Sequence, residues 1–257
     1  MNRYPWTGMD NINDSFFDGH YKDIWKAIIP EQLTSREVQF LIEYFQLKPG
    51  DKVLDMMCGY GRHSIALAEK GMQVTAIDNL PDYIAEIRAT AGELNLPLQA
   101  LQENVLEYRP AGKYKMIICM GNSLNFFDAN DTHVLLANWA EALEPGGRLL
   151  INSWSLAETV IPHFAEKSEA THGGININST SVFMFHPTRI ETQTRMTGTD
   201  SSSESKTAID YIYSVNEIEA LLSASGFQLE EIYDIPGKKK YSLGAPRAYI
   251  IAKLAGD

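Results

Sequence analysis

Short apolar runs alternate with amphipathic stretches between residues 52 and 154. The runs have the length of buried strands, and the stretches between them repeat apolar residues at helical spacing. This alternation is typical of βαβ units, which place parallel strands in one sheet with helices on its faces. The predicted strands cover 52–57, 73–78, 98–104, 114–120 and 147–154, and the predicted helices cover about 62–70, 81–94 and 131–143.

A further amphipathic stretch precedes the first strand. Residues 34–46 place Val38, Leu41, Ile42 and Phe45 at helical spacing. Thr34 or Ser35 is a suitable cap, because a hydroxyl can accept from the free N–H groups of the first turn. We expect a helix here that packs on the sheet.

The pattern changes after the fifth strand. Residues 175–185, 188–198 and 205–214 are rich in threonine, serine and β-branched residues, which indicates an antiparallel hairpin or a three-stranded insert. A helix at 215–226 and strands at 227–235 and 247–254 follow. The loop between these last strands has no helical period, so the final strand is expected to be antiparallel.

The predicted fold class is therefore α/β. It is a seven-stranded doubly wound sheet of order 3-2-1-4-5-7-6, with the last strand antiparallel and an antiparallel β insert after strand 5. A chain of 257 residues with 44% hydrophobic content is long enough for one large core, so we expect a single domain.

Composition narrows the classes of partner and compartment. The formal net charge of -11 opposes binding to phosphate backbones, so nucleic acid is a disfavoured partner. Two cysteines, each at the end of an apolar run, indicate reduced buried thiols and no metal site. No run has the length of a signal peptide or a membrane span, and we expect a cytoplasmic protein without a membrane partner.

The turn after the first strand carries the candidate chemistry. VLDMMCGYGRHS places Asp55 at the strand end and then a glycine-containing turn that opens a helix, where backbone N–H groups can approach a ligand. The second strand ends in Asp78, about 20 residues later, which suits a carboxylate that accepts ribose hydroxyls. Together these features indicate an adenosine-type cofactor.

Asp55 distinguishes between cofactors. The usual nicotinamide or flavin fingerprint places a pyrophosphate against the turn and has no acid at this position. A carboxylate would repel a pyrophosphate, but it can bond to the ammonium of an amino-acid moiety such as that of S-adenosylmethionine. From about residue 34 to 154 the chain resembles the class I, Rossmann-like methyltransferases of the small-molecule type, whose first motif reads [D/E]-x-G-x-G-x-G.

The resemblance implies a role for each position of the cofactor site. Asp55 would anchor the methionine amino group, and Asp78 the ribose. The other cofactor-binding residues that it implies are Met57, Cys58, Gly59, Gly61, His63, Asn79, Leu80, Asn104, Val105, Met120 and Gly121. Two positions depart from the family pattern, because Met57 replaces its first glycine and Asn104 its usual acid; Asn104 could still accept from the adenine amino group.

The same resemblance indicates an acceptor side. The turn CMGNSLNFF after the fourth strand is similar to a C-N-G-N-S-[LF] turn of small-molecule members, so Asn122 and Ser123 should face the substrate. Residues 1–33 resemble a lid, 34–154 the cofactor core and 155–213 a substrate-side insert, with 214–257 completing the sheet. Further substrate-side candidates are Tyr21, paired with Trp25 at helical spacing, and Trp154 and His186, all of which could equally be packing residues.

The predicted function is methyl transfer from S-adenosylmethionine to a small molecule, leaving S-adenosylhomocysteine. Alignment of nucleophile and leaving sulfur can supply much of the acceleration, so no catalytic residue needs to be visible in the sequence. Two alternatives are a cofactor-binding protein without turnover and a nicotinamide-dependent oxidoreductase. The acceptor, its nucleophilic atom and the oligomeric state are not specified by any motif.

Overall fold

A large mixed sheet forms the centre of the computed structural model, which describes residues 11–199 and 202–255. Its strand order is β11-β10-β12-β5-β4-β1-β2-β3. The strands are β1 (Lys52–Met56), β2 (Gln73–Asp78), β3 (Leu98–Gln102), β4 (Tyr114–Cys119), β5 (Leu143–Ser153), β10 (Phe227–Ile235), β11 (Lys239–Lys240) and β12 (Ala248–Leu254). β12 pairs antiparallel with both β5 and β10. The predicted seven-strand order is confirmed, with the two-residue β11 added at one edge.

Helices cover both faces of this sheet. α2 (Glu31–Tyr44), α3 (Arg62–Glu69) and α4 (Pro81–Glu93) lie on one face, and α5 (Ala129–Ala142) and α7 (Val215–Ala224) on the other. Successive strand residues point to opposite faces. Val53 accordingly packs with the α2 and α3 side, and Leu54 packs with the α5 side. Both are fully buried.

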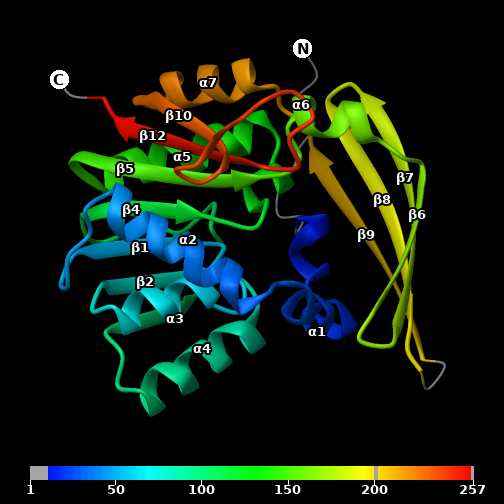
Figure 1. The fold of residues 1–257 in the computed structure, drawn as a ribbon, viewed down its shortest axis with the longest axis horizontal. Coiled ribbons are helices and arrows are strands. Elements are labelled where there is room, and N and C mark those ends of the chain that lie inside the picture. Colours follow the sequence, from blue (N-terminus) through cyan, green and yellow to red (C-terminus); the bar gives the residue numbers. More distant parts are fainter. Residues whose placement is uncertain (1–10, 200–201, 256–257) are drawn as a thin grey trace.

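A second, antiparallel sheet stands beside the carboxyl ends of β4 and β5 (Figure 1). It follows α6 (Ala157–Val160) and η3 (Ile161–His163), and its order is β6-β7-β8-β9. The strands are β6 (Lys167–His172), β7 (Ile175–Phe185), β8 (Thr188–Thr197) and β9 (Ser203–Tyr211). The insert therefore has one strand more than the sequence predicts. β6 is an edge strand with nearly every residue exposed, so it has no alternating pattern to reveal it.

Two helix starts differ from the prediction. α2 begins at Glu31 after Pro30, so Thr34 and Ser35 lie inside the helix and neither caps it. α5 begins at Ala129, because the side chain of Asp128 accepts from the backbone N–H groups of the first turn. In both places the N-cap residue lies a few residues before the first strongly apolar position. The apolar period alone therefore predicts a helix start that is too late in the chain.

The N-terminal segment lies between the two sheets (Figure 1). Its described part contains η1 (Ile12–Ser15) and α1 (Gly19–Ile28), and the short η2 (Ser123–Phe126) follows β4. The side chain of Asn13 pairs with the backbone of Ile209 on β9 through two hydrogen bonds of 2.9 Å, and that of Asn11 donates to Phe126 O at 2.9 Å. Among the helices of the described residues, none is long and apolar enough to cross a membrane.

Candidate active site

The turn after β1 requires left-handed backbone at three positions. Met57, Gly59 and Gly61 have φ angles of 57°, 56° and 77°. A Cβ at Gly61 would lie 2.6 Å from Ile87 Cγ1, so glycine is needed for α3 and α4 to approach. Met57 stands where the family motif has glycine, and a side chain in this conformation costs about 1–2 kcal/mol. The departure noted in the sequence is therefore one of residue type and leaves the geometry of the turn intact.

Two glycines leave backbone open at neighbouring strand ends. An added Cβ would meet no atom within 4 Å at Gly59, after β1, or at Gly121, after β4. A ligand could approach the main chain closely at both places. The open positions fit the cradle that the sequence predicts for S-adenosylmethionine.

Asp55 lies at the carboxyl end of β1 with 1% of its surface exposed. Oδ2 accepts from Ser64 Oγ at 2.5 Å, whereas Oδ1 is buried and has no hydrogen-bond partner among the described residues. Burial raises the pKa of Asp55 to about 7, although Ser64 opposes the shift. An unpaired buried oxygen is costly, so this position is suited to a ligand that donates hydrogen bonds or carries positive charge.

Asp78 lies at the end of β2 and connects two turns. Oδ2 accepts from Gly59 N at 2.8 Å, and Oδ1 accepts from Leu80 N at 3.0 Å. Burial raises its pKa, against the effect of these backbone donors. Each carboxylate oxygen keeps a second lone pair, so Asp78 can still accept from ribose hydroxyls. Asn79 instead directs its amide to Asp14 Oδ1 at 2.9 Å, which connects it to the N-terminal segment.

Beyond β3, Asn104 and Val105 have separate environments. The side-chain oxygen of Asn104 accepts from Leu106 N at 3.0 Å in a local turn, and the residue is exposed. Val105 is buried in the core between the sheet and α5. Asn104 therefore has a turn role in this structure, and its amide has capacity for a further bond.

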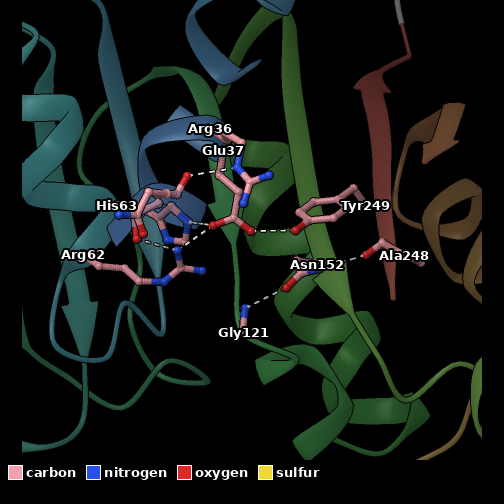
Figure 2. Close-up of polar contacts among 10 residues, drawn as sticks. Arg36, Glu37, Arg62, His63, Gly121, Asn152, Ala248 and Tyr249 are labelled. Atoms are coloured by element: carbon pink, nitrogen blue, oxygen red, sulfur yellow. Dashed lines mark hydrogen bonds and ion pairs between the residues drawn. The ribbon is translucent and has the colours of Figure 1, made fainter. Parts of the chain in front are cut away.

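A buried ionic cluster joins α2 and β12 to the start of α3, directly after the turn that follows β1 (Figure 2). Glu37 on α2 is 3% exposed; Oε2 receives Arg62 Nη1 at 2.5 Å and His63 Nε2 at 3.0 Å, and Oε1 receives Tyr249 OH at 2.6 Å. Burial alone would raise the pKa of Glu37, but His63 and Arg62 outweigh it and lower the pKa to about 2.

His63 therefore contributes to this cluster. Burial lowers its pKa, and the charge of Arg62 adds to that effect, so the neutral ring donates to Glu37. The sequence places His63 in the cofactor shell, whereas the structure has it connecting α3 to α2. Glu37 was missed because one acid in an amphipathic helix resembles a solvent-facing residue.

The turn after β4 is held by two asparagines. Asn152 on β5 accepts from Gly121 N at 3.4 Å and donates to Ala248 O at 3.1 Å (Figure 2). Asn122, 1% exposed, accepts from Trp154 N at 2.9 Å and donates to Asp210 Oδ1 at 2.8 Å. The amide of Asn122 is thus fully engaged and connects β4, β5 and β9.

The remaining residues of this turn also bond internally. Ser123 Oγ donates to Met120 O at 3.0 Å, and both residues are nearly buried. The sequence predicts that Asn122 and Ser123 face the substrate, but the structure directs their polar groups into the protein. Asp210, which accepts from Asn122, was not among the candidates, because nothing in its β-rich segment distinguishes it from other polar strand residues.

Aromatic side chains of α1, in the N-terminal segment, pack against Trp154. Tyr21 and Trp25 on α1 are stacked with ring centroids 6.3 Å apart, and Trp25 lies 5.6 Å from Trp154. α1 is fastened to α4, where Lys22 forms an ion pair with Glu86. Trp25 thus connects Tyr21 to Trp154, two of the substrate-side candidates. His186 is not brought to them, because it lies in the exposed turn between β7 and β8.

Comparison with known proteins shows which domain family the core of the chain matches. Residues 53–147 match the family model described as "Methyltransferase domain". A glycine/sarcosine N-methyltransferase of Halorhodospira halochloris is 28% identical over 147 residues, which are 56% of this chain and 54% of that protein. The chain thus spans about half the length of this relative.

Two further matches differ in the share of the chain that they cover. A 23S rRNA (uracil(1939)-C(5))-methyltransferase of Shewanella sediminis is 28% identical over 95 residues, covering 37% of this chain and 20% of that protein. A solved S-adenosylmethionine-dependent methyltransferase from Clostridium acetobutylicum superposes with a TM-score of 0.78 at 17% identity and covers 92% of this chain and 96% of its own. The core of the chain thus matches a methyltransferase domain in sequence, and the described chain shares the fold of a solved S-adenosylmethionine-dependent methyltransferase.

Proposed function

We propose that the protein transfers a methyl group from S-adenosylmethionine to a small-molecule acceptor. The observation that carries this proposal is Asp55, whose buried Oδ1 has no partner among the described residues and lies at the turn that opens α3. A ligand ammonium would satisfy it. A pyrophosphate, as in a nicotinamide cofactor, would be repelled by it.

The remaining cofactor contacts follow from the strand ends. Asp78 would accept from the ribose, and the open backbone at Gly59 and Gly121 would receive the rest of the ligand. Bound S-adenosylmethionine supplies an electrophilic methyl group on a sulfonium sulfur. The protein aligns the acceptor with that group and excludes water, and such positioning can supply much of the acceleration.

Three features favour a small acceptor over a nucleic acid. The net charge is -11, and a surface of that sign repels phosphate backbones. The N-terminal segment contacts the segment after β4 where Asn11 donates to Phe126 O, and the insert contacts it where Asp210 accepts from Asn122, which suits an enclosed ligand. The glycine/sarcosine N-methyltransferase also resembles this chain over a longer stretch than the rRNA enzyme. A protein that binds the cofactor without turnover is less favoured, because the segments that would enclose an acceptor are present beside the turn after β4.

The test has two parts. Calorimetry with S-adenosylmethionine and with NAD should show binding of the first only, and a metabolite library should contain an acceptor that releases S-adenosylhomocysteine. Asp78→Ala should weaken cofactor binding by about 2 kcal/mol, since it removes charge-assisted hydrogen bonds. Asp82→Ala is the matched control, because that carboxylate is 81% exposed on α4. Unchanged affinity in Asp78→Ala, or methyl incorporation into RNA or DNA with steep salt dependence, would contradict the proposal.

A further inference from the structure

The cofactor site does not account for Asp210 on β9. Its Oδ1 receives Asn122 Nδ2 at 2.8 Å and Ser155 Oγ at 3.3 Å. Within the described parts of the chain, Oδ2 receives no hydrogen bond and the carboxylate forms no ion pair. One oxygen is therefore fixed by the turn after β4, while the other is left for a ligand.

An aromatic wall lies beside this carboxylate. It consists of Tyr21, Trp25 and Trp154, which are in successive ring contact. Two links connect the wall to Asp210. The amide of Asn122 that donates to Asp210 also accepts from Trp154 N at 2.9 Å, and the charge of Asp210 adds to the burial that raises the pKa of Tyr21 to about 12.

The chemistry of these groups selects one class of ligand. Aromatic faces attract cations, more strongly when water is excluded, and a carboxylate oxygen accepts from an ammonium. A neutral alcohol could also donate to the carboxylate, but it has no positive charge for the aromatic faces or the carboxylate to attract. No basic side chain of residues 11–199 or 202–255 pairs with Asp210, whose two partners there are an amide and a hydroxyl.

We propose that Asp210 and the aromatic wall bind the methyl acceptor as a protonated amine, and that Asp210 removes its proton before transfer. This inference rests on the proposed methyltransferase function and specifies its substrate class. It assigns a catalytic role to a residue outside the cofactor motif.

The proposed step balances as follows. A proton passes from the ammonium nitrogen to Asp210 Oδ2, and the freed lone pair forms the new nitrogen–carbon bond. The carbon–sulfur bond breaks, and its electron pair stays on sulfur. Burial raises the pKa of Asp210 to about 6 against the hydrogen bonds from Ser155 and Asn122, which makes the carboxylate a stronger base. Among the described titratable groups, Tyr21 on α1 is affected by this carboxylate, whose charge adds to the burial that raises the pKa of Tyr21.

The binding test uses the full chain with S-adenosylhomocysteine and two probes of matched shape, benzylammonium and benzyl alcohol. Wild type should bind benzylammonium at least about tenfold more tightly, and Asp210→Asn should lose about 10–100-fold of that affinity. The substitution keeps an oxygen for Asn122 and Ser155, so the fold should be retained. Glu191→Gln, on the neighbouring strand β8, removes an equal charge and should change neither probe.

Equal binding of the two probes, including no binding of either at tens of millimolar, would overturn the inference. So would unchanged benzylammonium affinity in Asp210→Asn. Failure of S-adenosylhomocysteine to bind would instead contradict the proposed function, and the two failures are distinguishable because the probes can be titrated without it.

A second readout addresses proton removal. With an amine acceptor, the rate deficit of Asp210→Asn should shrink about tenfold for each pH unit gained, because more free amine is present at higher pH. A deficit that does not change with pH would contradict the role of Asp210 as a base.

Discussion

The two sheets of this protein are built by different means. In β1 every residue after Lys52 is buried, and the strand is covered by helices on both faces. In β7 no residue is buried, and half-buried positions alternate with exposed ones. The main sheet is thus stabilised by burial, whereas the second sheet depends on its hydrogen-bond ladder and on contacts with its neighbours.

This difference separates stability from recognition. The residues proposed to bind the cofactor lie at the ends of buried parallel strands, where Asp55 and Asp78 are held by hydrogen bonds from the turn after β1 and from α3. Asp210 lies on the second sheet and reaches the main sheet through Asn122. Variation in the insert could alter the acceptor without disturbing the cofactor site, which agrees with the general separation of scaffold and site.

The largest effect is expected at Glu37, on the main-sheet side. Glu37→Gln would leave the partly buried Arg62 without its counter-charge and weaken the bonds of His63 and Tyr249. We expect a loss of about 3–5 kcal/mol in the free energy of unfolding, measured by denaturant titration. Glu43→Gln on the exposed side of the same helix is the control and should cost less than about 0.5 kcal/mol. Equal effects in the two variants would show that the buried cluster does not support the core.

Removal of residues 1–30 should separate the two regions. The deletion ends before α2, so the main sheet and cofactor binding should persist, while turnover falls at least about 100-fold because the cover over the acceptor is lost. Residues 1–10 lie outside the described residues, and the prediction rests on η1 and α1. Lys22→Ala, which removes the ion pairs with Glu86 and Asp82 and keeps the segment, should lower the free energy of unfolding by at most about 1 kcal/mol. Wild-type turnover in the truncated protein would contradict a role for this segment.

The main sheet could be predicted from the sequence because its signals are local. Buried parallel strands give continuous apolar runs, and the turn VLDMMCGYGRHS carries Asp55 and both glycines in one segment. The order of seven strands followed from these runs together with the family resemblance.

The acceptor side could not be predicted in the same way, since its contacts join distant segments. Asp210 meets Asn122 across 88 positions, and the buried cluster on the main sheet has the same property, because Tyr249 meets Glu37 across 212. Neither pair has a spacing that a period or motif could reveal. Two of the candidates show the same limit: Asn122 and His63 lie near the expected ligand in sequence, and the sequence does not reveal that their side chains bond inside the protein.

A pH effect on cofactor affinity should be intermediate in size. Because burial raises the pKa of Asp55 to about 7, the ligand-free carboxyl is protonated below that pH, and binding an ammonium must release the proton. Affinity should fall up to about tenfold per unit as pH decreases from 7. Calorimetry between about pH 5 and 7 in buffers of different ionisation enthalpy measures this release. Asp55→Asn should flatten the dependence, and what remains would report Asp78, whose pKa is also raised.

The same group has the opposite effect on the ligand-free fold. An acid whose pKa is higher in the folded than in the unfolded state stabilises the fold at low pH, and this contribution is lost as pH rises through the window from about 4 to 7. The Asp55→Asn variant should therefore gain stability relative to wild type as pH increases. A pH-independent difference between the two would show that Asp55 is ionised throughout.

The smallest effect is expected at the exposed turn between β7 and β8 of the second sheet. Phe185 is 71% exposed beside His186, so Phe185→Ser removes little buried area and should change the free energy of unfolding by less than about 0.5 kcal/mol. Ile117→Ala, in the fully buried strand β4, should cost about 2–5 kcal/mol by contrast. Cofactor affinity and turnover should also be unchanged in Phe185→Ser, because His186 and its neighbours have no bond to Asp210 or Asn122 among the described residues. A loss of turnover with intact cofactor binding would show instead that this turn takes part in acceptor binding. The main sheet would still provide stability, but acceptor binding would then involve the whole second sheet and not only the part of it near Asp210.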